Sequence, residues 1–305
     1  MRFLKALVIV AAVCLIPANL LANPIRFGVP PWPGVTVKTE VVCQILNAMG
    51  HETNQLEIGP PVIYKGLTAG DVDAYVAAWI PQQNGMFIPL KENKAIDIIR
   101  VNVDQADTGL AVPTYVWDAG VRSVADLDKH ADKFDRTIFG IEVGSGMHTS
   151  TEEMISNDVA GLGDWELVGS TTPVMLTAVD DRVRQNKWAV FHAWRPHWMT
   201  LKIDMKFLEG VPGSEKLISS SVVYTVASND FAEKYPQARA FLSNFYVPAE
   251  IQSAWIYAFG FEKKDPVDVA RTWIAENPET VAKWLEGVLT VDGKPAFDAV
   301  RDKIK

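Results

Sequence analysis

Strand-like and helix-like segments alternate along this chain, and this alternation restricts its fold more than any other feature. An apolar run at 25–29 precedes a helical pattern at 37–49, and runs at 54–58 and 73–79 flank a second helical pattern at 61–69. Strands that alternate with helices build a parallel or mixed sheet with helices on its faces. The sequence therefore predicts an α/β fold.

Chain length and a second series of alternating segments predict two lobes. About 283 residues follow position 22, which is more than a single hydrophobic core usually serves. The series restarts after Pro113, and the predicted limits are 23–112 plus 218–305 for lobe I and 113–217 for lobe II. The chain would cross between the lobes near 110–114 and near 212–222. Two interdomain crossings form a hinge beside a central ligand cleft, as in a binding protein that closes on its ligand.

The first 22 residues have the pattern of a secretory signal peptide. Arg2 and Lys5 precede an apolar stretch at 6–16, which is too short for a transmembrane helix. Small residues before position 23 suit cleavage after Ala22, so we expect a periplasmic protein. Lipoprotein anchoring is not expected, because the residue before Cys14 fits a lipidation motif poorly.

Charge and cysteine content exclude several classes of protein. The formal net charge is −8 at pH 7, and the predicted signal would remove two basic residues more. An acidic exported protein is a poor partner for nucleic acid or anionic lipid. Only Cys43 remains after cleavage, so no intramolecular disulfide is expected, and its apolar neighbours predict a buried core position.

Four aromatic residues follow the ends of predicted strands: Trp32, Trp79, Tyr115 and Trp194. Ligands of open α/β sheets bind beyond the carboxyl ends of strands. Aromatic faces attract cations, and quaternary ammonium groups suit cages of such rings. We therefore predict that lobe closure brings these four rings around one cationic ligand, the alternative being that they are core residues. Whether Trp117 or Trp198 joins them stays open.

A carboxylate on the ligand would need hydrogen-bond donors. The loop Gly144–Gly146, with Ser145 at its centre, leads into a helix whose first N–H groups are free. The Gly34–Val35 backbone is a second source of donors. Arg195 and His197 follow Trp194 closely, although a solvated Arg195 and a structurally hydrogen-bonded His197 are the alternatives.

Sequence motifs for catalysis, cofactors or metals are missing. The chain has no H-E-x-x-H, dinucleotide-binding or phosphate-loop pattern, and the loop at 144–146 lacks the upstream glycine of a nucleophile elbow. We expect no cofactor and no metal site. The best candidate for a secreted hydrolase of a choline-bearing substrate is Ser145 with His148, and no residue is seen to orient that histidine. A receptor lobe that presents ligand to a sensor is a further alternative.

Five segments carry a family resemblance, and they occur in this order: Trp32–Val37, Asp73–Pro81, Leu110–Gly120, Gly140–Gly144 and Asn186–Met199. Through them the chain resembles the glycine betaine/choline substrate-binding proteins of ABC importers. The resemblance implies a two-lobed periplasmic binding protein fold, and we expect a monomer. It also implies that the protein delivers a quaternary-ammonium ligand to an ABC permease and its ATPase.

The resemblance also implies roles for single residues. Trp32, Trp79, Tyr115 and Trp194 match the aromatic box of the family. Choline-type members have an acidic residue and an asparagine where this chain has Gly34 and Ser145, so their contacts to the choline hydroxyl are missing. In betaine-type members the ligand carboxylate meets backbone N–H groups and a histidine, roles that Gly34, Val35 and His197 fit. A glycine betaine-like ligand is therefore expected, with choline, carnitine or trimethylamine N-oxide as alternatives.

Overall fold

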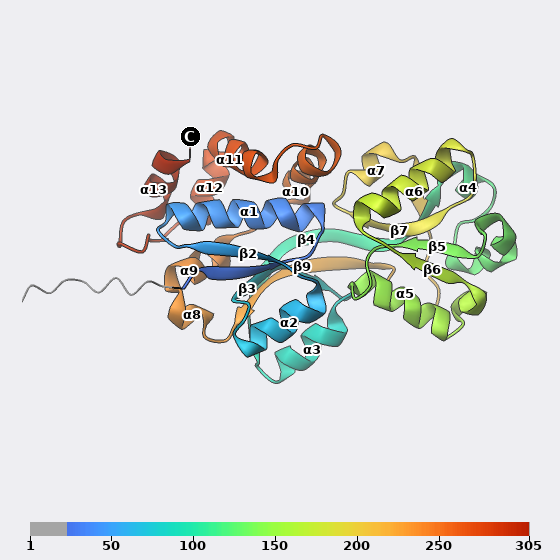
Figure 1. Cartoon of the computed structure of the whole chain (residues 1–305), viewed down its shortest axis with the longest axis horizontal. Helices are drawn as coiled ribbons and strands as arrows, with labels where there is room; N and C mark the ends of the chain where they lie inside the picture. Colours follow the sequence, from blue (N-terminus) through green and yellow to red (C-terminus); the bar gives the residue numbers. More distant parts are fainter. Residues whose placement is uncertain (1–22, 305) are drawn as a thin grey trace, which may run out of the picture.

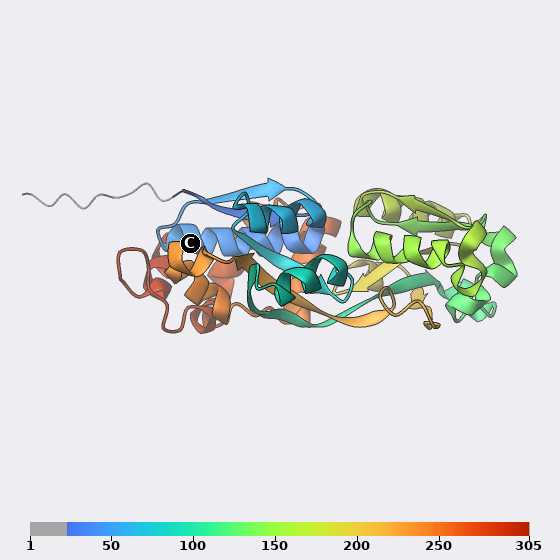
Figure 2. The ribbon, with the colours of Figure 1, turned by 90° about the horizontal axis from the view of Figure 1, so that it is seen from below.

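The computed structural model describes residues 23–304, and it shows two α/β lobes arranged end to end (Figure 1). The predicted signal peptide at 1–22 lies outside the described residues. Seen from below, long strands pass from one lobe to the other, which accounts for the elongated outline of the molecule (Figure 2). The observed architecture confirms the predicted fold class.

A mixed sheet runs through both lobes. Its strands are β1 (Ile25–Val29), β2 (Thr53–Glu57), β3 (Ala74–Ile80), β4 (Ile96–Pro113), β5 (Thr137–Gly140), β6 (Glu166–Gly169), β7 (Val190–Arg195), β8 (Met205–Phe207) and β9 (Ser219–Ser228). They lie in the order β2-β1-β3-β9-β4-β7-β5-β6, and β8 also pairs with β4. The pairs β1–β2, β1–β3, β5–β6 and β5–β7 are parallel, whereas the pairs made by β4 and β9 are antiparallel.

The strand β4 differs from its prediction. The sequence indicated separate strands at 98–103 and 108–112, but 96–113 is continuous. It pairs with β9 from Ile96 to Thr108 through several register shifts, and these irregularities interrupt the alternation of apolar residues that a regular strand would show. The antiparallel pair of β4 and β9 connects the lobes.

Helices cover both faces of the sheet in each lobe. Around the first lobe lie α1 (Pro33–Ala48), α2 (Pro60–Ala69), α3 (Asn84–Glu92), α8 (Phe231–Lys234), α9 (Pro236–Asn244), α10 (Ala249–Ile256), the π-helical turn η4 (Tyr257–Phe261), α11 (Pro266–Glu276), α12 (Pro278–Trp284) and α13 (Ala296–Lys303). The second lobe has α4 (Thr114–Asp118), η1 (Val124–Asp126), η2 (Asp128–Phe134), α5 (Gly146–Ser156), η3 (Val159–Asp164), α6 (Thr172–Arg184) and α7 (Met199–Lys202). The helices α1 and α10–α13 lie on one face of the first lobe, and α2 and α3 lie on the other (Figure 1).

Each lobe has its own hydrophobic core. Buried residues of the first core come from 25–106 and from 223–300, and those of the second come from 110–217. Cys43 is buried in the first core, within α1. Leu110–Val112 pack in the second core because β4 continues past the junction. The C-terminal helices therefore return to the first lobe.

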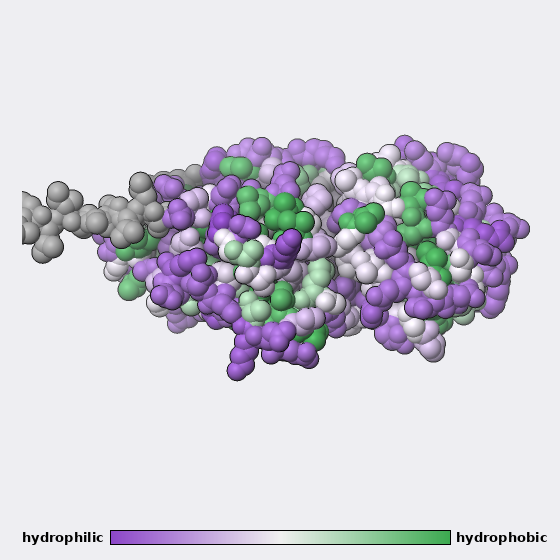
Figure 3. Space-filling view, turned by 60° about the horizontal axis from the view of Figure 1, so that its bottom comes forward, coloured by the Kyte–Doolittle hydropathy of each residue, from purple (hydrophilic) through white to green (hydrophobic). Residues whose placement is uncertain are grey.

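The molecular surface is mainly hydrophilic on the face shown in Figure 3, where hydrophobic residues form small patches between hydrophilic ones. Within residues 23–304, no helix combines the length and apolar character needed to span a bilayer.

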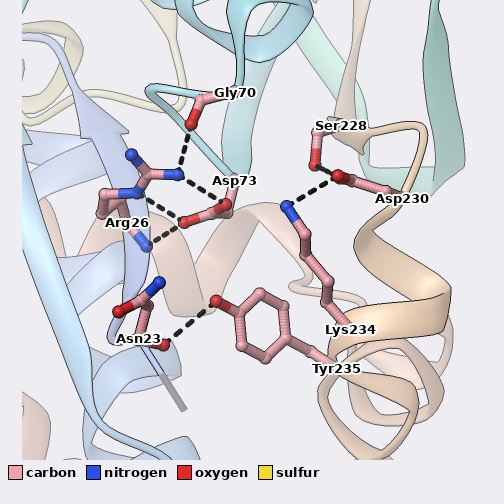
Figure 4. Close-up of polar contacts among 8 residues, drawn as sticks. All are labelled: Asn23, Arg26, Gly70, Asp73, Ser228, Asp230, Lys234 and Tyr235. Atoms are coloured by element: carbon pink, nitrogen blue, oxygen red, sulfur yellow. Dashed lines mark hydrogen bonds and ion pairs between the residues drawn. The ribbon is translucent and has the colours of Figure 1, made fainter. Parts of the chain in front are cut away.

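A buried ion pair ties β1 to the start of β3 at the outer end of the first lobe (Figure 4). Arg26 donates from Nε to Oδ2 of Asp73 at 2.9 Å and from Nη2 to Oδ1 at 3.0 Å, and its backbone N–H donates to Oδ2 at 2.8 Å. The Asp73 side chain is 2% exposed, so it depends on these donors. Nearby, Tyr235 donates to the backbone carbonyl of Asn23 at 3.0 Å, which fixes the first described residue.

Arg26→Ala should lower the free energy of unfolding by about 2 kcal/mol, because it leaves a buried carboxylate without its cation. The expected loss is below that of a fully buried pair, since the Arg26 side chain is 30% exposed. Urea unfolding followed by circular dichroism measures it. Arg271→Ala is the matched control, because its ion pair with Asp268 is exposed and should contribute under about 0.5 kcal/mol. Equal losses in the two variants would contradict the prediction.

Candidate functional site

A cavity lies between the lobes and is lined by residues of both. Its empty volume is about 590 Å³, open space at its mouth included. The first lobe contributes side chains from α1, β3 and α10, and the second contributes them from β7, the start of α5 and the residue after β5. The lining residues used below are Trp32, Gly34, Val35, Lys38, Trp79, Gln82, Thr108, Ser145, Gly146, Met147, Trp194 and Gln252.

Three tryptophans bring aromatic faces to this cavity. Trp32 stands at the N-terminal end of α1, directly after β1, while Trp79 lies near the end of β3. Trp194 lies near the end of β7 in the second lobe and is 8% exposed. The ends of β1, β3 and β7 thus meet at the junction of the lobes, as ligand sites of α/β sheets do. Rings from both lobes therefore face one space.

Tyr115, the fourth predicted member of the box, does not line the cavity. It lies in α4, past the end of β4, and packs at the edge of the second core. Its hydroxyl donates to the backbone carbonyl of Lys187. The turn into α4 directs this side chain over the second lobe, apart from the three tryptophans that line the cavity. Trp117 and Trp198 also lie outside the cavity lining.

Backbone donors reach the cavity from both lobes. The N–H of Val35 is already bonded to the carbonyl of Trp32 at 3.0 Å, whereas the N–H of Gly34 has no acceptor among the described residues. At the start of α5, the Ser145 hydroxyl accepts the N–H of His148, and the N–H groups of Gly146 and Met147 are left without a described acceptor. Free N–H groups at helix N-termini favour anions. Of the predicted donors, Gly34 and the loop around Ser145 therefore line the cavity and have backbone N–H groups without a described acceptor.

His197 lies behind Trp194 and does not line the cavity. The two ring centroids are 4.8 Å apart in an edge-on arrangement. Its Nδ1 accepts the N–H of Met199 at 3.1 Å, so the proton of the neutral ring resides on Nε2. Burial lowers the pKa of His197 to about 3, and Nε2 has no hydrogen-bond partner among the described residues. In this arrangement His197 supports Trp194 and does not face the ligand space.

Glu142 joins the two lobes, and no local pattern around it predicts this role. Its Oε1 accepts the indole N–H of Trp32, a residue of the first lobe. Its Oε2 is buried and has no hydrogen-bond partner among residues 23–304, and burial raises the pKa of this carboxyl. The bond orients the Trp32 ring and exists only while the lobes are together.

Glu142→Ala should raise the dissociation constant of the bound ligand at least about tenfold, since a hydrogen bond to a charged acceptor contributes roughly 1.5–3 kcal/mol. The variant should release the ligand faster than the wild type, with little change in the association rate, because the bond forms only when the lobes are closed. Stopped-flow tryptophan fluorescence measures it. Glu142→Gln keeps an oxygen that can accept the indole N–H, so it should lose less. An equal loss of affinity in Glu142→Gln and Glu142→Ala would contradict the prediction, because glutamine still offers an acceptor to the Trp32 indole.

Polar side chains that the sequence analysis missed complete the lining. Gln82 donates to Thr108 and to Ser219, so it bridges β4 and β9 in the wall of the cavity. Gln252 comes from α10, far along the chain, and its Oε1 is buried without a described partner. Lys38 is the charged residue of the lining. A lysine on the apolar face of the first helix was a usable signal for Lys38, but nothing local marks Gln252.

The geometry gives no support to a hydrolase. The Ser145 hydroxyl meets the backbone N–H of His148, not its ring. The ring bonds instead to the carbonyl of Ile141 at 3.0 Å and lies 3.5 Å from Glu152. Ser145 therefore has no base beside it. Among residues 23–304, no group of three or more His, Cys, Asp or Glu side chains is placed to hold a metal ion.

Curated relatives match parts of the chain. The glycine betaine/carnitine transport binding protein GbuC of Listeria monocytogenes is 32% identical over 190 residues, which are 60% of this chain and 61% of that protein. An uncharacterised protein, ORF1, of Chromohalobacter salexigens is 34% identical over 144 residues, covering 47% of this chain and 93% of that protein.

Solved structures match over almost the whole chain. An ABC-transporter choline-binding protein in complex with choline has a TM-score of 0.89 and 26% identity, covering 93% of this chain and 99% of the other. Lactococcal OpuAC, closed on glycine betaine, has a TM-score of 0.76 and 27% identity, covering 86% of this chain and 98% of the other. Both are two-lobed binding proteins, in agreement with the predicted fold and resemblance.

The family described as the substrate-binding domain of ABC-type glycine betaine transport systems matches residues 23–276. This range includes the three cavity tryptophans, Glu142 and the helix α10 that supplies Gln252. The match covers most of the chain, and the folds of the solved relatives agree with it. The chain therefore belongs to this family of ABC-transporter substrate-binding domains.

Proposed function

We propose that this protein captures a glycine betaine-like compound, a quaternary ammonium with a carboxylate, and delivers it to an ABC permease and its ATPase. The observation that carries the proposal is the meeting of Trp32, Trp79 and Trp194 around one cavity between the lobes. Family membership makes the chain a transport binding protein, which confirms the prediction that it is not an enzyme.

The aromatic side of the cavity suits a cation that cannot donate hydrogen bonds. Each ring face contributes roughly 0.5–2 kcal/mol, so three rings contribute up to about 6 kcal/mol before the cost of closing the lobes. A quaternary ammonium group spreads its charge over methyl groups, which pack against indole faces and leave no polar hydrogen unsatisfied. This chemistry is shared by betaine, choline and carnitine.

The polar side of the cavity favours a carboxylate. Free N–H groups of Gly34 on one lobe and of Gly146 and Met147 on the other are available to an anion. No acidic side chain belongs to the described lining, so nothing there would accept the hydroxyl proton of choline in the manner of a carboxylate. The relatives carry names of both ligand classes, choline for one and glycine betaine or carnitine for others.

We propose that the mature protein acts as a monomer in the periplasm, without a lipid anchor. The signal-peptide pattern at 1–22 supports export, and the family consists of transport binding domains. A receptor that hands ligand to a sensor would share this fold, and a neighbouring permease and ATPase in the genome would argue for transport instead.

Isothermal titration of the mature chain tests the proposed ligand. Glycine betaine and proline betaine should bind in the micromolar range or tighter, and carnitine, choline and trimethylamine N-oxide should bind more weakly. Tight choline binding without a betaine signal would overturn the carboxylate half of the proposal. No binding by any compound of the panel would overturn the proposal as a whole.

A further inference from the structure

A lysine lies in the wall of a cavity that we assign to a cation. Lys38, in α1, is fully buried and is the single ionisable residue of the described cavity lining. A buried ammonium would repel a purely cationic ligand, because charges interact strongly where water is excluded. Its presence needs an explanation that the aromatic cage does not supply.

The Lys38 ammonium is held in place but not neutralised. Its Nζ donates to Oδ1 of Asn102 at 2.9 Å. The Asn102 amide is fixed in turn, since its Nδ2 donates to the carbonyl of Val76 at 3.0 Å and to Oγ1 of Thr225 at 2.8 Å. Within residues 23–304 no carboxylate pairs with Lys38, and no second hydrogen bond of its ammonium is formed. Two of its three N–H donors thus have no partner in the described part of the chain.

The unpaired ammonium shares a helix face with a free backbone donor. Gly34 lies one turn before Lys38 on α1, so the two positions face the same side. Gln252 packs against Gly34 so closely that a Cβ atom on Gly34 would be 3.0 Å from its Nε2. Gly34, Lys38 and Gln252 all line the cavity, and together they form a polar corner.

We propose that Lys38 is a specificity-determining residue of this binding site, and that its ammonium pairs with the ligand carboxylate. The inference rests on the proposed function, because it assumes a quaternary ammonium in the aromatic cage. A zwitterion such as glycine betaine satisfies both ends of the cavity. Choline brings its cation to the same rings but leaves the Lys38 charge unpaired.

Burial supports this role because it makes the protonation of Lys38 sensitive to pH and to a bound carboxylate. It lowers the pKa of Lys38 to about 7. A bound carboxylate favours the protonated form and raises that pKa, so betaine binding should take up protons at pH 8. Betaine affinity should then fall as pH rises above about 7, whereas choline affinity should rise up to about pH 7, where the repelling charge is lost, and level off above it.

The other ionisable groups around α1 lie outside the described cavity lining. On the elements that pack against α1 and Lys38, the charged side chains are exposed, ion-paired or bonded to carbonyl groups: Glu57, Asp104, Glu250, the pairs Arg26–Asp73, Asp97–Arg239, Asp268–Arg271 and Asp298–Arg301, and Arg100. Tyr75 of β3 is neutral because burial raises its pKa, and His197 is neutral because burial lowers its pKa to about 3. Glu142, whose pKa burial raises, is the buried acid nearest the tryptophans and needs its own control.

Titrations of Lys38→Gln and Lys38→Met with glycine betaine and with choline test the inference. Glutamine keeps a donor for Asn102 and methionine keeps the apolar volume, so one variant should fold if the other does not. We expect each to weaken betaine binding at least tenfold and to strengthen choline binding severalfold, thereby inverting the preference. The matched control is Lys283→Met, an exposed lysine of α12, which should leave the betaine-to-choline ratio unchanged.

Proton uptake provides a second readout. Betaine titrations at pH 8 in phosphate and in Tris, whose ionisation enthalpies differ, should show uptake in the wild type and in Glu142→Gln, and none in Lys38→Met. Proton uptake that persists in Lys38→Met, or equal losses of affinity for betaine and choline in the Lys38 variants, would overturn the role of Lys38. Neither result would contradict the aromatic cage. Absence of binding by either compound in the wild type would instead overturn the proposed function.

Discussion

Trp194→Ala should weaken the binding of glycine betaine roughly 100- to 1,000-fold, the size of effect seen when a central aromatic anchor is removed. The residue supplies the aromatic face contributed by the second lobe, and it is 8% exposed. Its removal takes away a cation–π contact, the apolar area of the ring and the contact that closes the cage from that side. Isothermal titration at a temperature well below unfolding measures the loss.

Two further variants make this result specific to the cage. Trp194→Phe keeps a ring with a weaker quadrupole, so its loss should be intermediate. Tyr115→Ala removes the aromatic residue that the sequence placed in the box and the structure places outside it, so it should change affinity by no more than about threefold. Retained affinity in Trp194→Ala, or a loss in Tyr115→Ala as large as in Trp194→Ala, would show that the cage has a different composition.

Gly146→Ala should lower ligand affinity at least 100-fold while leaving the fold intact. A Cβ atom at position 146 would lie 2.3 Å from the carbonyl oxygen of Gln82 and 2.6 Å from its carbonyl carbon. Gly146 begins α5 in the second lobe and Gln82 belongs to the first, so the clash would hold the lobes apart. Affinity falls with the fraction of molecules able to adopt the binding arrangement. Small-angle scattering with and without ligand would show a molecule that stays open.

The effect of Gly146→Ala on stability should have the opposite sign. Position 146 is helical, and alanine is favoured over glycine in helices by up to about 1 kcal/mol. The melting temperature of the free protein should therefore hold or rise while binding is lost. Gly85→Ala is the matched control, since Gly85 lies in the first turn of α3 and a Cβ atom there would meet nothing within 4 Å. Normal affinity in Gly146→Ala would mean that the lobes can close without this contact.

Much of the fold could be read from the sequence because its signals are local. Apolar runs at 25–29 and 73–79 lie at β1 and β3, and proline at the start of α1 and α2 suits their first turns. The division of β4 into two strands was wrong, because register shifts against β9 break the regular alternation of a strand. The continuity of β4 therefore depends on its pairing with β9, which is distant in the sequence.

The tryptophans of the cavity lining were predictable for a related reason. Ligands of open α/β sheets bind beyond the carboxyl ends of the strands, so residues that follow predicted strands are candidates without further knowledge of the fold. Trp32, Trp79 and Trp194 could be identified in this way. Tyr115 also follows a predicted strand, but it lies in α4 and its hydroxyl bonds to the second lobe. The direction of a side chain after a turn depends on packing that a single sequence window does not contain.

The sequence by itself determined the alternation of strands and helices and the places of the tryptophans after predicted strands, because each depends on neighbouring residues. The tertiary structure alone decided which polar groups meet those rings. Lys38 and Gln252 line the same cavity because α10 packs on α1, and Glu142 reaches Trp32 because β4 and β9 hold the lobes together. Long-range packing, which no local pattern records, therefore sets the chemistry of the polar side of this cavity.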